Sequence, residues 1–524
     1  MEQQYEAWPE DLKINGRIVI HHHLKEPATL QRTLERSVQN KNVVVLETSE
    51  QLLDDEWLRV LRATIGDQGR VTISSLRQLP DDFDEFDCAV FAGSLDGIDA
   101  FAKLEPSLNA LLRRGGTLVV DEAVGKWLGK YNVVSTESLK TQPGLNLLPD
   151  CIFDPTLEAD SMLDVVREHP RSVGVTLSSG SALVLSGRKL IAYGPGSATI
   201  SVAKGTASSP ASVTIADAEN GRRRDPESYL ADLTQWRRMA IDRDLPPFPG
   251  EQPPMPVVEN GTLIIVGGGG APKGHMDRFV ELAGGTEKAR LVYVPCSEND
   301  FVGERQRMVE SWKRMGVVNA TFIHTKDRRQ ANIDEDFLAP LKDATGIYFG
   351  GGRQWNFSDS YYGTKAHALM KDVLKRGGVI AGSSAGASIQ GRYLARATPI
   401  GNFKLMAPGY ERGGLGFLPG VAIDQHFTQR GRQKDMTGLI EVYPQLLGIG
   451  IDEATAIEVQ KSVATVSGPG RVFFYDANAE QNDDDADYVA LPDGSSYDLA
   501  RRVVLKDTRG NSKAESPAKD TSQE

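Results

Sequence analysis

The sequence contains little of what marks a disulfide-bonded, membrane-spanning or exported protein. Only three cysteines occur in 524 residues, and their spacing fits neither a disulfide framework nor a metal site. No apolar run approaches the roughly 18 residues that cross a bilayer. The first residues contain neither the basic nor the apolar region of a signal peptide. We expect a cytoplasmic protein without a membrane partner, and secretion stays open if a leader was trimmed.

Positive charge is also in deficit. The chain has 59 Lys and Arg against 71 Asp and Glu, which gives a formal net charge of -12. Proteins that bind nucleic acids present basic surfaces, so we expect no nucleic-acid partner. Hydrophobic residues make up 40% and charged residues 25%, a balance typical of folded globular proteins.

Short apolar runs rich in Val and Ile alternate with amphipathic stretches along the whole chain. Examples are RIVIHHH and KNVVVLE in the first half, and GTLIIVGG, TGIYFGG and GGVIAGS in the second. Between them, stretches such as KAHALMKDVLKRG have apolar residues at helical spacing and end at glycine. This alternation predicts a doubly wound α/β sheet, mostly parallel. Functional residues in such sheets lie at the carboxyl ends of strands.

The two halves of the sequence resemble each other. Several stretches of the first half have counterparts in the second, in the same order, among them LLRRGGTLVVDEAVG and VLKRGGVIAGSSAGA. An internal duplication explains this order better than chance does. We predict an α/β repeat at 1–203, a linker with a helix and a proline-rich connector at 204–257, a second α/β domain at 258–506 and a disordered tail at 507–524.

One serine has the setting of a nucleophile. GSSAG fits the pattern G-x-S-x-G with Ser384 at its centre, between an apolar run and a helical stretch. Strand, sharp turn and helix form the context of a nucleophile elbow. Of the eight histidines only His426 follows Ser384, at the end of the apolar run AIDQH, where it is a candidate general base. On the motif alone, a plain turn of small residues stays an open alternative.

Two glycine runs and one histidine run were candidates for binding sites. In YFGGGRQWN, Gly351 and Gly352 are candidate oxyanion donors through their N–H groups, with Ala385 as the other donor. The run that begins at Gly267 lacks the spacing of a dinucleotide motif. The side chains of three consecutive histidines, 21–23, alternate between the faces of a strand. We therefore expect no metal site and no cofactor.

Four motifs carry a resemblance to a known family. FGGGRQ, GSSAGA, GFLPGVAIDQHFTQRGR and LGIGIDEATAI, in this order, resemble cyanophycinase and its relatives, a serine peptidase family that includes aspartyl dipeptidase. The resemblance covers about Gly261 to Asp476 and implies a class I glutamine-amidotransferase-like, that is flavodoxin-like, three-layer sandwich. It implies Ser384 as nucleophile and His426 as base. The residues implied to line the substrate site are Gln354, Asp424, Gln425, Arg430 and Arg432.

The resemblance also implies an acidic residue between the serine and the histidine. From Ala385 to Tyr410 this chain has no Asp or Glu, and Asn402 stands at the matching interval. An asparagine can orient an imidazole, so Asn402 is the expected third catalytic residue. In the first half, Glu122 stands where Ser384 does and Thr156 where His426 does. We expect a non-catalytic copy there, and either a homodimer or an intrachain pseudo-dimer.

The leading hypothesis is a serine-type peptidase that works through an acyl-enzyme. Its expected substrate is cyanophycin, a polyaspartate with arginine on its side chains, cut to β-Asp-Arg dipeptides, or a similar peptide. Alternatives are a catalytically impaired pseudoenzyme or binding protein on the same fold, and an isoaspartyl or aspartyl dipeptidase. An α/β-hydrolase esterase also fits the elbow, but it predicts a late histidine, and no histidine follows His426.

Overall fold

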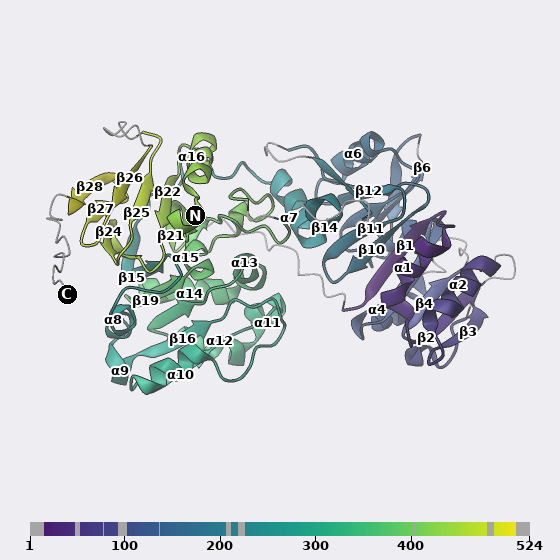
Figure 1. Cartoon of the computed structure of the whole chain (residues 1–524), viewed down its shortest axis with the longest axis horizontal. Helices are drawn as coiled ribbons and strands as arrows, with labels where there is room; N and C mark the ends of the chain where they lie inside the picture. The colour runs from purple at the N-terminus through teal and green to yellow at the C-terminus, as the bar shows by residue number, and fades with distance from the viewer. Residues whose placement is uncertain are drawn as a thin grey trace, which may run out of the picture. The chain divides into compact units, whose positions relative to one another are not determined.

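The chain folds into two compact units that meet in the sequence at Pro247 and Phe248 (Figure 1). The computed structural model describes residues 15–47, 53–76, 78–92, 102–135, 137–205, 211–217, 226–401, 404–478 and 487–509. Each unit has two β-sheets with helices packed against them. The predicted α/β class is therefore confirmed as a mixed α/β architecture.

The described residues of the N-terminal unit form an eight-stranded and a six-stranded sheet. The larger has the order β14 (Leu230–Asp232), β11 (Lys189–Tyr193), β10 (Ser181–Ser186), β1 (Arg17–His22), β5 (Thr117–Asp121), β4 (Cys88–Phe91), β2 (Asn42–Glu47), β3 (Arg70–Ser75). The smaller has the order β13 (Ser212–Ala216), β12 (Ser197–Ser201), β9 (Val173–Leu177), β8 (Cys151–Phe153), β6 (Tyr131–Ser135), β7 (Lys140–Pro143). The helices are α1 (Pro27–Val38), α2 (Asp55–Ile65), α4 (Glu105–Arg113), α5 (Glu122–Leu128), α6 (Ala159–Glu168) and α7 (Leu233–Asp244).

The described residues of the C-terminal unit form a nine-stranded and a five-stranded sheet. The larger has the order β17 (Asn319–Phe322), β16 (Arg290–Val294), β18 (Gly346–Phe349), β19 (Val379–Ser383), β15 (Val258–Val266), β23 (Ala456–Lys461), β24 (Val463–Ser467), β27 (Ser496–Asp498), β28 (Val503–Lys506). The smaller has the order β20 (Gly391–Tyr393), β21 (Leu418–Gln425), β22 (Leu447–Ile451), β25 (Val472–Tyr475), β26 (Tyr488–Leu491). The helices are α8 (His275–Leu282), α9 (Gly285–Lys288), α10 (Arg307–Arg314), α11 (Arg328–Ile333), α12 (Glu335–Lys342), α13 (Trp355–Tyr361), α14 (Lys365–Lys375), α15 (Ala385–Ser388) and α16 (Gln433–Val442).

The larger sheets of the two units share one strand order. In each, four strands run parallel to a central strand, β1 or β15, and the next strand on its other side is antiparallel. The registers agree as well: His21 pairs with Asp121 and Ala182, as Val266 pairs with Ser383 and Ala456. The mostly parallel sheet expected from the sequence is thus a parallel core with antiparallel strands added at one edge.

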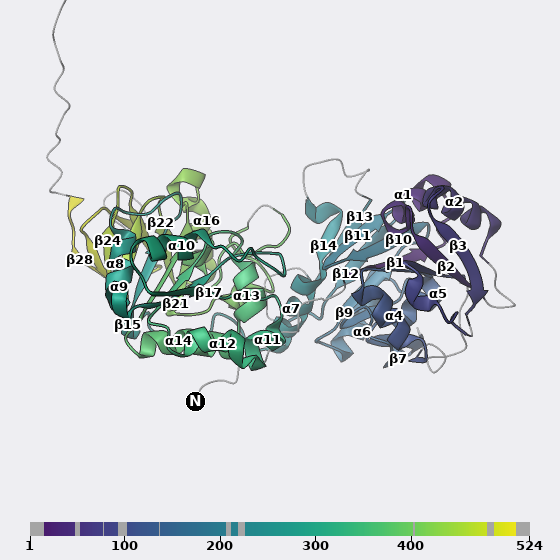
Figure 2. The same cartoon turned by 90° about the horizontal axis from the view of Figure 1, so that it is seen from below.

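Continuous apolar strands produce a core on both faces of each large sheet. In the C-terminal unit one face packs on α8 and α10, and the other packs on α11, α12, α14 and the smaller sheet (Figure 2). In the N-terminal unit α1 and α2 cover one face, while α4, α5 and the smaller sheet cover the other (Figure 2). Because both faces are buried, the strands read as nearly unbroken hydrophobic runs. The carboxyl ends of β15, β18 and β19 then come together at one edge.

The segment expected as a linker, 204–257, is largely built into the units. It supplies β13 and β14 to the sheets of the N-terminal unit and the helix α7, whose Leu233, Met239 and Ala240 are buried. Residues 206–210 and 218–225 of that segment lie outside the described part of the chain, as does the expected tail from 510 onward. Within the described part, no helix combines the length and apolar character needed to cross a bilayer.

Candidate active site

Ser384 occupies a sharp turn between β19 and α15. Its backbone has φ 57° and ψ −114°, a conformation that residues other than glycine rarely adopt. Such a conformation costs on the order of 1–3 kcal/mol. A Cβ on Gly382 would lie 2.2 Å from the Gly386 carbonyl oxygen, and one on Gly386 would lie 2.1 Å from that of Phe349. Both flanking positions of the G-x-S-x-G pattern therefore need glycine. The geometry is that of a nucleophile elbow.

His426 follows the last residue of β21 and reaches the elbow. Its backbone N–H donates to the Gly267 carbonyl oxygen at 2.8 Å, and its φ of 50° turns the chain at this point. The Nε2 atom lies 3.0 Å from Ser384 Oγ. This is within hydrogen-bond reach for a general base and its nucleophile. The structure thus brings together the two residues that the sequence pointed to.

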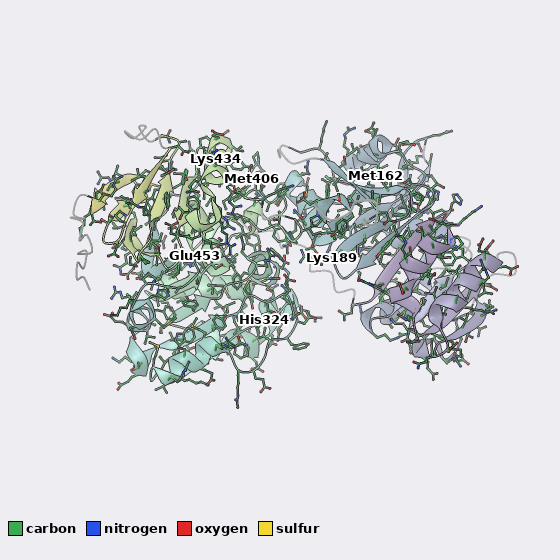
Figure 3. All side chains as sticks on the ribbon, in the orientation of Figure 1. Met162, Lys189, His324, Met406, Lys434 and Glu453 are labelled. Atoms are coloured by element: carbon green, nitrogen blue, oxygen red, sulfur yellow. The ribbon has the colours of Figure 1, made fainter. Side chains whose placement is uncertain are left out.

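A carboxylate orients the histidine from its other side. Glu453, in the turn between β22 and β23, places Oε1 2.5 Å from His426 Nδ1. Because an ionised carboxylate only accepts hydrogen bonds, Nδ1 carries the proton and Nε2 can accept one from Ser384. Figure 3 shows Glu453 in the region between the two sheets of this unit. The three side chains form a Ser–His–Glu line.

Glu453 corrects the expected order of the catalytic residues. The acid lies 27 residues after the histidine, not between the serine and the histidine. Asn402, expected in this place, lies outside the described residues. The signal was present in the motif LGIGIDEATAI, whose acidic pair directly follows a strand end. The chain order implied by the resemblance pointed instead to the interval between Ser384 and His426.

Burial shifts the proton equilibrium of His426. Desolvation lowers the pKa of this imidazole below its usual 6.5, and the charges of Arg430 and Arg432 act in the same direction. The hydrogen bond and the charge of Glu453 oppose this by raising the pKa. The net direction is downward, so His426 is neutral at pH 7 and can accept a proton.

The backbone of Gly351 and that of Ala385 lie next to Ser384. A Cβ built on Gly351 would lie 4.0 Å from Ser384 Oγ, so the backbone of this glycine passes beside the nucleophile. Ala385 is the first residue of α15, and its N–H has no partner inside the helix. Gly352 has φ 150° and packs against Cys296, where a Cβ would come within 2.9 Å of the carbonyl oxygen. Gly351 and Ala385 are therefore better placed than Gly352 to hold an oxyanion.

The glycine run that begins at Gly267 belongs to this site. A Cβ on Gly268 would lie 2.5 Å from both Cε1 and Nε2 of His426, and 3.1 Å from the Ser384 Cβ. A Cβ on Gly269 would lie 2.4 Å from the Glu453 carboxyl group. By its sequence alone, this run resembles a phosphate-binding turn only weakly. The glycines are instead needed because the backbone passes directly over the catalytic side chains.

Three of the residues expected to contact substrate are engaged within the protein. Asp424 is fully buried and accepts hydrogen bonds from Arg396 Nε and Arg432 Nη1, both at 2.8 Å. Gln354 is buried, and its Nε2 donates to the carbonyl oxygens of Ala395 and Arg396. Arg432, implied by the resemblance to line the substrate site, is paired here with a carboxylate of the protein itself. Asp424, Arg432 and Gln354 instead fix the strand ends around the site.

Arg430 and Gln425 remain as candidates for substrate contact. Arg430 ends a short 3-10 helix (Thr428–Arg430), is exposed, and has no carboxylate partner among the described residues. Its backbone N–H donates to the His426 carbonyl oxygen at 3.1 Å, so it lies beside the base, and its charge lowers the pKa of His426. Gln425 is buried, and its Oε1 has no hydrogen-bond partner among the described residues. Both lie within one residue or one turn of His426.

The comparisons with known proteins find similarity to peptidases. Residues 263–467 match the model of Peptidase family S51. We call this matched stretch, which contains Ser384, His426 and Glu453, the S51 region. A cyanophycinase from Geminocystis herdmanii is 28% identical over 262 residues, which cover 49% of this chain and 96% of that protein. A Peptidase E from Citrobacter koseri is 29% identical over 154 residues, covering 28% of this chain and 65% of that protein.

A solved structure of a peptidase from an acI-B1 Actinobacterium matches with a TM-score of 0.34 and 22% identity, covering 46% of this chain and 97% of that one. The family match and the cyanophycinase relative confirm the predicted cyanophycinase-like serine peptidase in the S51 region.

The close approach of Gly268 to the base predicts the effect of one added methyl group. We expect Gly268→Ala to lower kcat/KM by about 100-fold or more, because the methyl group displaces the His426 ring and small displacements of catalytic groups cost that much. Gly438→Ala is the matched control, since a Cβ there meets nothing within 4 Å. Circular dichroism and kinetics on both proteins check this. A fully active Gly268→Ala protein with an unchanged fold would contradict the geometry.

The role of Glu453 predicts a change in both rate and pH profile. We expect Glu453→Gln to lower kcat by about 10²–10⁴-fold, because the imidazole loses its orienting carboxylate. Since Glu453 raises the pKa of His426, its neutralisation lowers that pKa, and the acid limb of kcat/KM moves to lower pH. Because the pKa of His426 is lowered from the ordinary histidine value of 6.5, chiefly by burial, we expect the acid limb of the wild-type protein below that pH.

Glu441→Gln, at an exposed carboxylate on α16, is the control for Glu453→Gln. A Glu453→Gln protein whose acid limb moves to higher pH, or whose kcat equals that of the control, would show that Glu453 does not act on the base.

Proposed function

We propose that the S51 region hydrolyses peptide bonds beside aspartyl residues, with a cyanophycin-like polymer as its substrate and β-Asp-Arg dipeptides as products. The observation that carries the proposal is the Ser384–His426–Glu453 line, with contacts of 3.0 and 2.5 Å. The cyanophycinase relatives support the substrate class. The reaction needs no cofactor, because each step is a proton transfer or an attack by oxygen.

The mechanism proceeds in two halves. Ser384 Oγ attacks the scissile carbonyl carbon while its proton passes to His426 Nε2, and the imidazolium is stabilised by Glu453. The oxyanion accepts hydrogen bonds from the N–H groups of Gly351 and Ala385, each contributing about 3–4 kcal/mol to stabilisation of the transition state. The C–N bond then breaks, and the leaving amine takes the proton from His426. Water attacks the ester by the same route in reverse and restores Ser384.

Arg430 is the group that we assign to recognition of the aspartyl carboxylate. An exposed guanidinium near the base can bind that carboxylate by paired, charge-assisted hydrogen bonds. Gln425 Oε1, buried and unpartnered among the described residues, is a second candidate because it can accept a hydrogen bond from a substrate N–H. Both would contribute to substrate binding before the chemical step, so replacing either residue would change KM.

Two other functions are compatible with this fold. An isoaspartyl or aspartyl dipeptidase would use the same three residues, and the Peptidase E relatives favour it. A pseudoenzyme was suggested by the missing acid, and the position of Glu453 removes that reason. The substrates in the test below separate the first alternative from the cyanophycin reading.

We further propose that the chain is an internal duplication of a glutamine-amidotransferase-like, that is flavodoxin-like, sandwich. The shared strand order and register of the two large sheets support this. The smaller sheets add support, because β6-β8-β9-β12-β13 and β20-β21-β22-β25-β26 follow one order and one pattern of directions. In the N-terminal unit Glu122 and Thr156 stand at the register positions of Ser384 and His426, so that copy is non-catalytic. Pairing as a homodimer or an intrachain pseudo-dimer stays a prediction.

The function is tested by replacing the nucleophile. We expect wild-type protein to release β-Asp-Arg from cyanophycin and Ser384→Ala to lose about 10⁶-fold in kcat, as removal of a serine nucleophile does elsewhere. Ser383→Ala is the matched control and should keep most of its activity. Chromatography of the products, with isoaspartyl and aspartyl dipeptides as parallel substrates, checks this. Hydrolysis of the dipeptides alone would select the dipeptidase, and equal rates for all three proteins would refute the peptidase site.

The role of Arg430 is tested through the Michaelis constant. We expect Arg430→Gln to raise KM about 10- to 100-fold on an aspartyl substrate, the usual worth of a charge-assisted hydrogen bond, with a smaller change in kcat. Arg314→Gln, at a cation on the outer helix α10, is the control. An unchanged KM for Arg430→Gln would assign carboxylate recognition elsewhere.

A further inference from the structure

The N-terminal unit carries a cluster of metal-ligating side chains where the active site lies in the other unit. His22, His23 and Glu122 each place one potential ligand atom within 4.8 Å of the other two. His23 Nε2 lies 3.6 Å from Glu122 Oε1. The rings of His22 and His23 have centroids 4.7 Å apart. Two imidazoles and a carboxylate at the carboxyl ends of β1 and β5 thus face one another.

The strand alternation expected from the sequence holds for two of the three histidines only. His21 and His22 point to opposite faces of β1, and His21 packs on Trp57 with ring centroids 4.6 Å apart. The strand ends at His22, and His23 has φ 48°, in the left-handed region. This turn brings the ring of His23 beside that of His22. Two consecutive histidines can therefore act at one point.

The register explains why His23 and Glu122 meet. His23 stands at the register position of Gly268 in the C-terminal unit, and Glu122 at that of Ser384. A Cβ on Gly268 would lie 3.1 Å from the Ser384 Cβ, so side chains at these two positions are directed at each other. In the N-terminal unit both positions have metal-ligating side chains.

The hydrogen bonds around the cluster leave its ligand atoms available. His22 Nδ1 lies 2.8 Å from the Leu177 carbonyl oxygen, and since a carbonyl only accepts, Nδ1 carries the proton and Nε2 keeps its lone pair. A ring N–H bound to a carbonyl is also the usual second contact of a metal-ligating histidine. Lys126, one turn along α5 from Glu122, has its Nζ 3.6 Å from Asp154 Oδ2. That cation is engaged by another carboxylate.

We propose that His22, His23 and Glu122 form a zinc site in the N-terminal unit. Two imidazoles and a carboxylate are a ligand set that zinc accepts, and three protein ligands leave a fourth position for water or a small anion. Ligand atoms around a tetrahedral zinc ion lie about 3.3–3.5 Å apart, close to the 3.6 Å between His23 and Glu122. Small side-chain rotations close the remaining gap. The exposed side chain of His23 gives the ion access from solvent.

Zinc titration of the untagged full-length chain, stripped with a chelator, tests the proposal. We expect one equivalent of Zn²⁺ to bind by isothermal calorimetry, and His23→Ala and Glu122→Gln each to weaken that binding at least tenfold. His169→Ala is the control in the same unit, because that ring stacks on Tyr131 and contacts Thr141 instead. Circular dichroism of each variant establishes that it is folded.

Two further measurements locate the ion. Co²⁺ in place of Zn²⁺ should give visible absorption of tetrahedral intensity that His23→Ala removes and His426→Ala leaves. Absence of binding, binding that the His23 and Glu122 variants do not change, or binding lost only with His426→Ala would overturn the proposal. None of these readouts depends on peptidase activity, so the zinc site and the proposed function stand or fall separately.

Discussion

No side chain fits between the end of β15 and the imidazole of His426, and the catalytic arrangement depends on that close approach. A Cβ on Gly268 would lie 2.5 Å from two ring atoms, closer than carbon atoms can come without displacement. The same turn accepts the His426 N–H at the Gly267 carbonyl and the Ala454 N–H at the Gly268 carbonyl, each at 2.8 Å. These two hydrogen bonds hold the end of β21, which carries the base His426, and the turn that carries the acid Glu453 against the same glycine backbone. Base, acid and nucleophile share one backbone support.

Strained backbone conformations occur in the site at, or next to, the residues whose side chains form the catalytic hydrogen bonds. Ser384, His426 and Ala454, beside Glu453, all have positive φ, between 50° and 57°. Each such residue costs on the order of 1–3 kcal/mol unless its surroundings enforce it. Here the enforcement comes from buried strands on either side, such as β19 and β22, whose residues are almost all inaccessible to solvent. The rigid sheets hold the strained corners that connect them to the catalytic side chains.

The sequence alone predicts catalytic residues that directly follow a buried strand. It does not predict contacts between side chains on different strands. Ser384 and His426 could be found because each follows an apolar strand and has the chemistry of its role. Glu453 satisfied the same rule, but an expected order of catalytic residues pointed to Asn402 instead. The pairing of Asp424 with Arg396 and Arg432 could not be found in this way. Local sequence shows that a residue is charged, whereas its partner depends on which strands become neighbours.

The same limit explains the connector and the histidines. The segment 204–257 is polar and rich in proline, and its own composition therefore predicts a linker. Its short strands β13 and β14 are defined only by the sheets that they join. For the histidines, alternation along a strand was sound reasoning up to the residue where the strand ends. The left-handed turn at His23 has no marker in the sequence, because glycine would have been its usual occupant.

Position 23 decides what the N-terminal unit can do. Its register counterpart, Gly268, must lack a side chain for an imidazole to sit beside the elbow. In the N-terminal unit the side chain of His23 occupies the space that the His426 ring fills in the other unit, whatever residues stand at 122 and 156. An imidazole placed as that of His426 is placed would therefore have no room beside position 122. The same position thus favours an imidazole of the base in one unit, where it is glycine, and the proposed cation site in the other, where it is histidine.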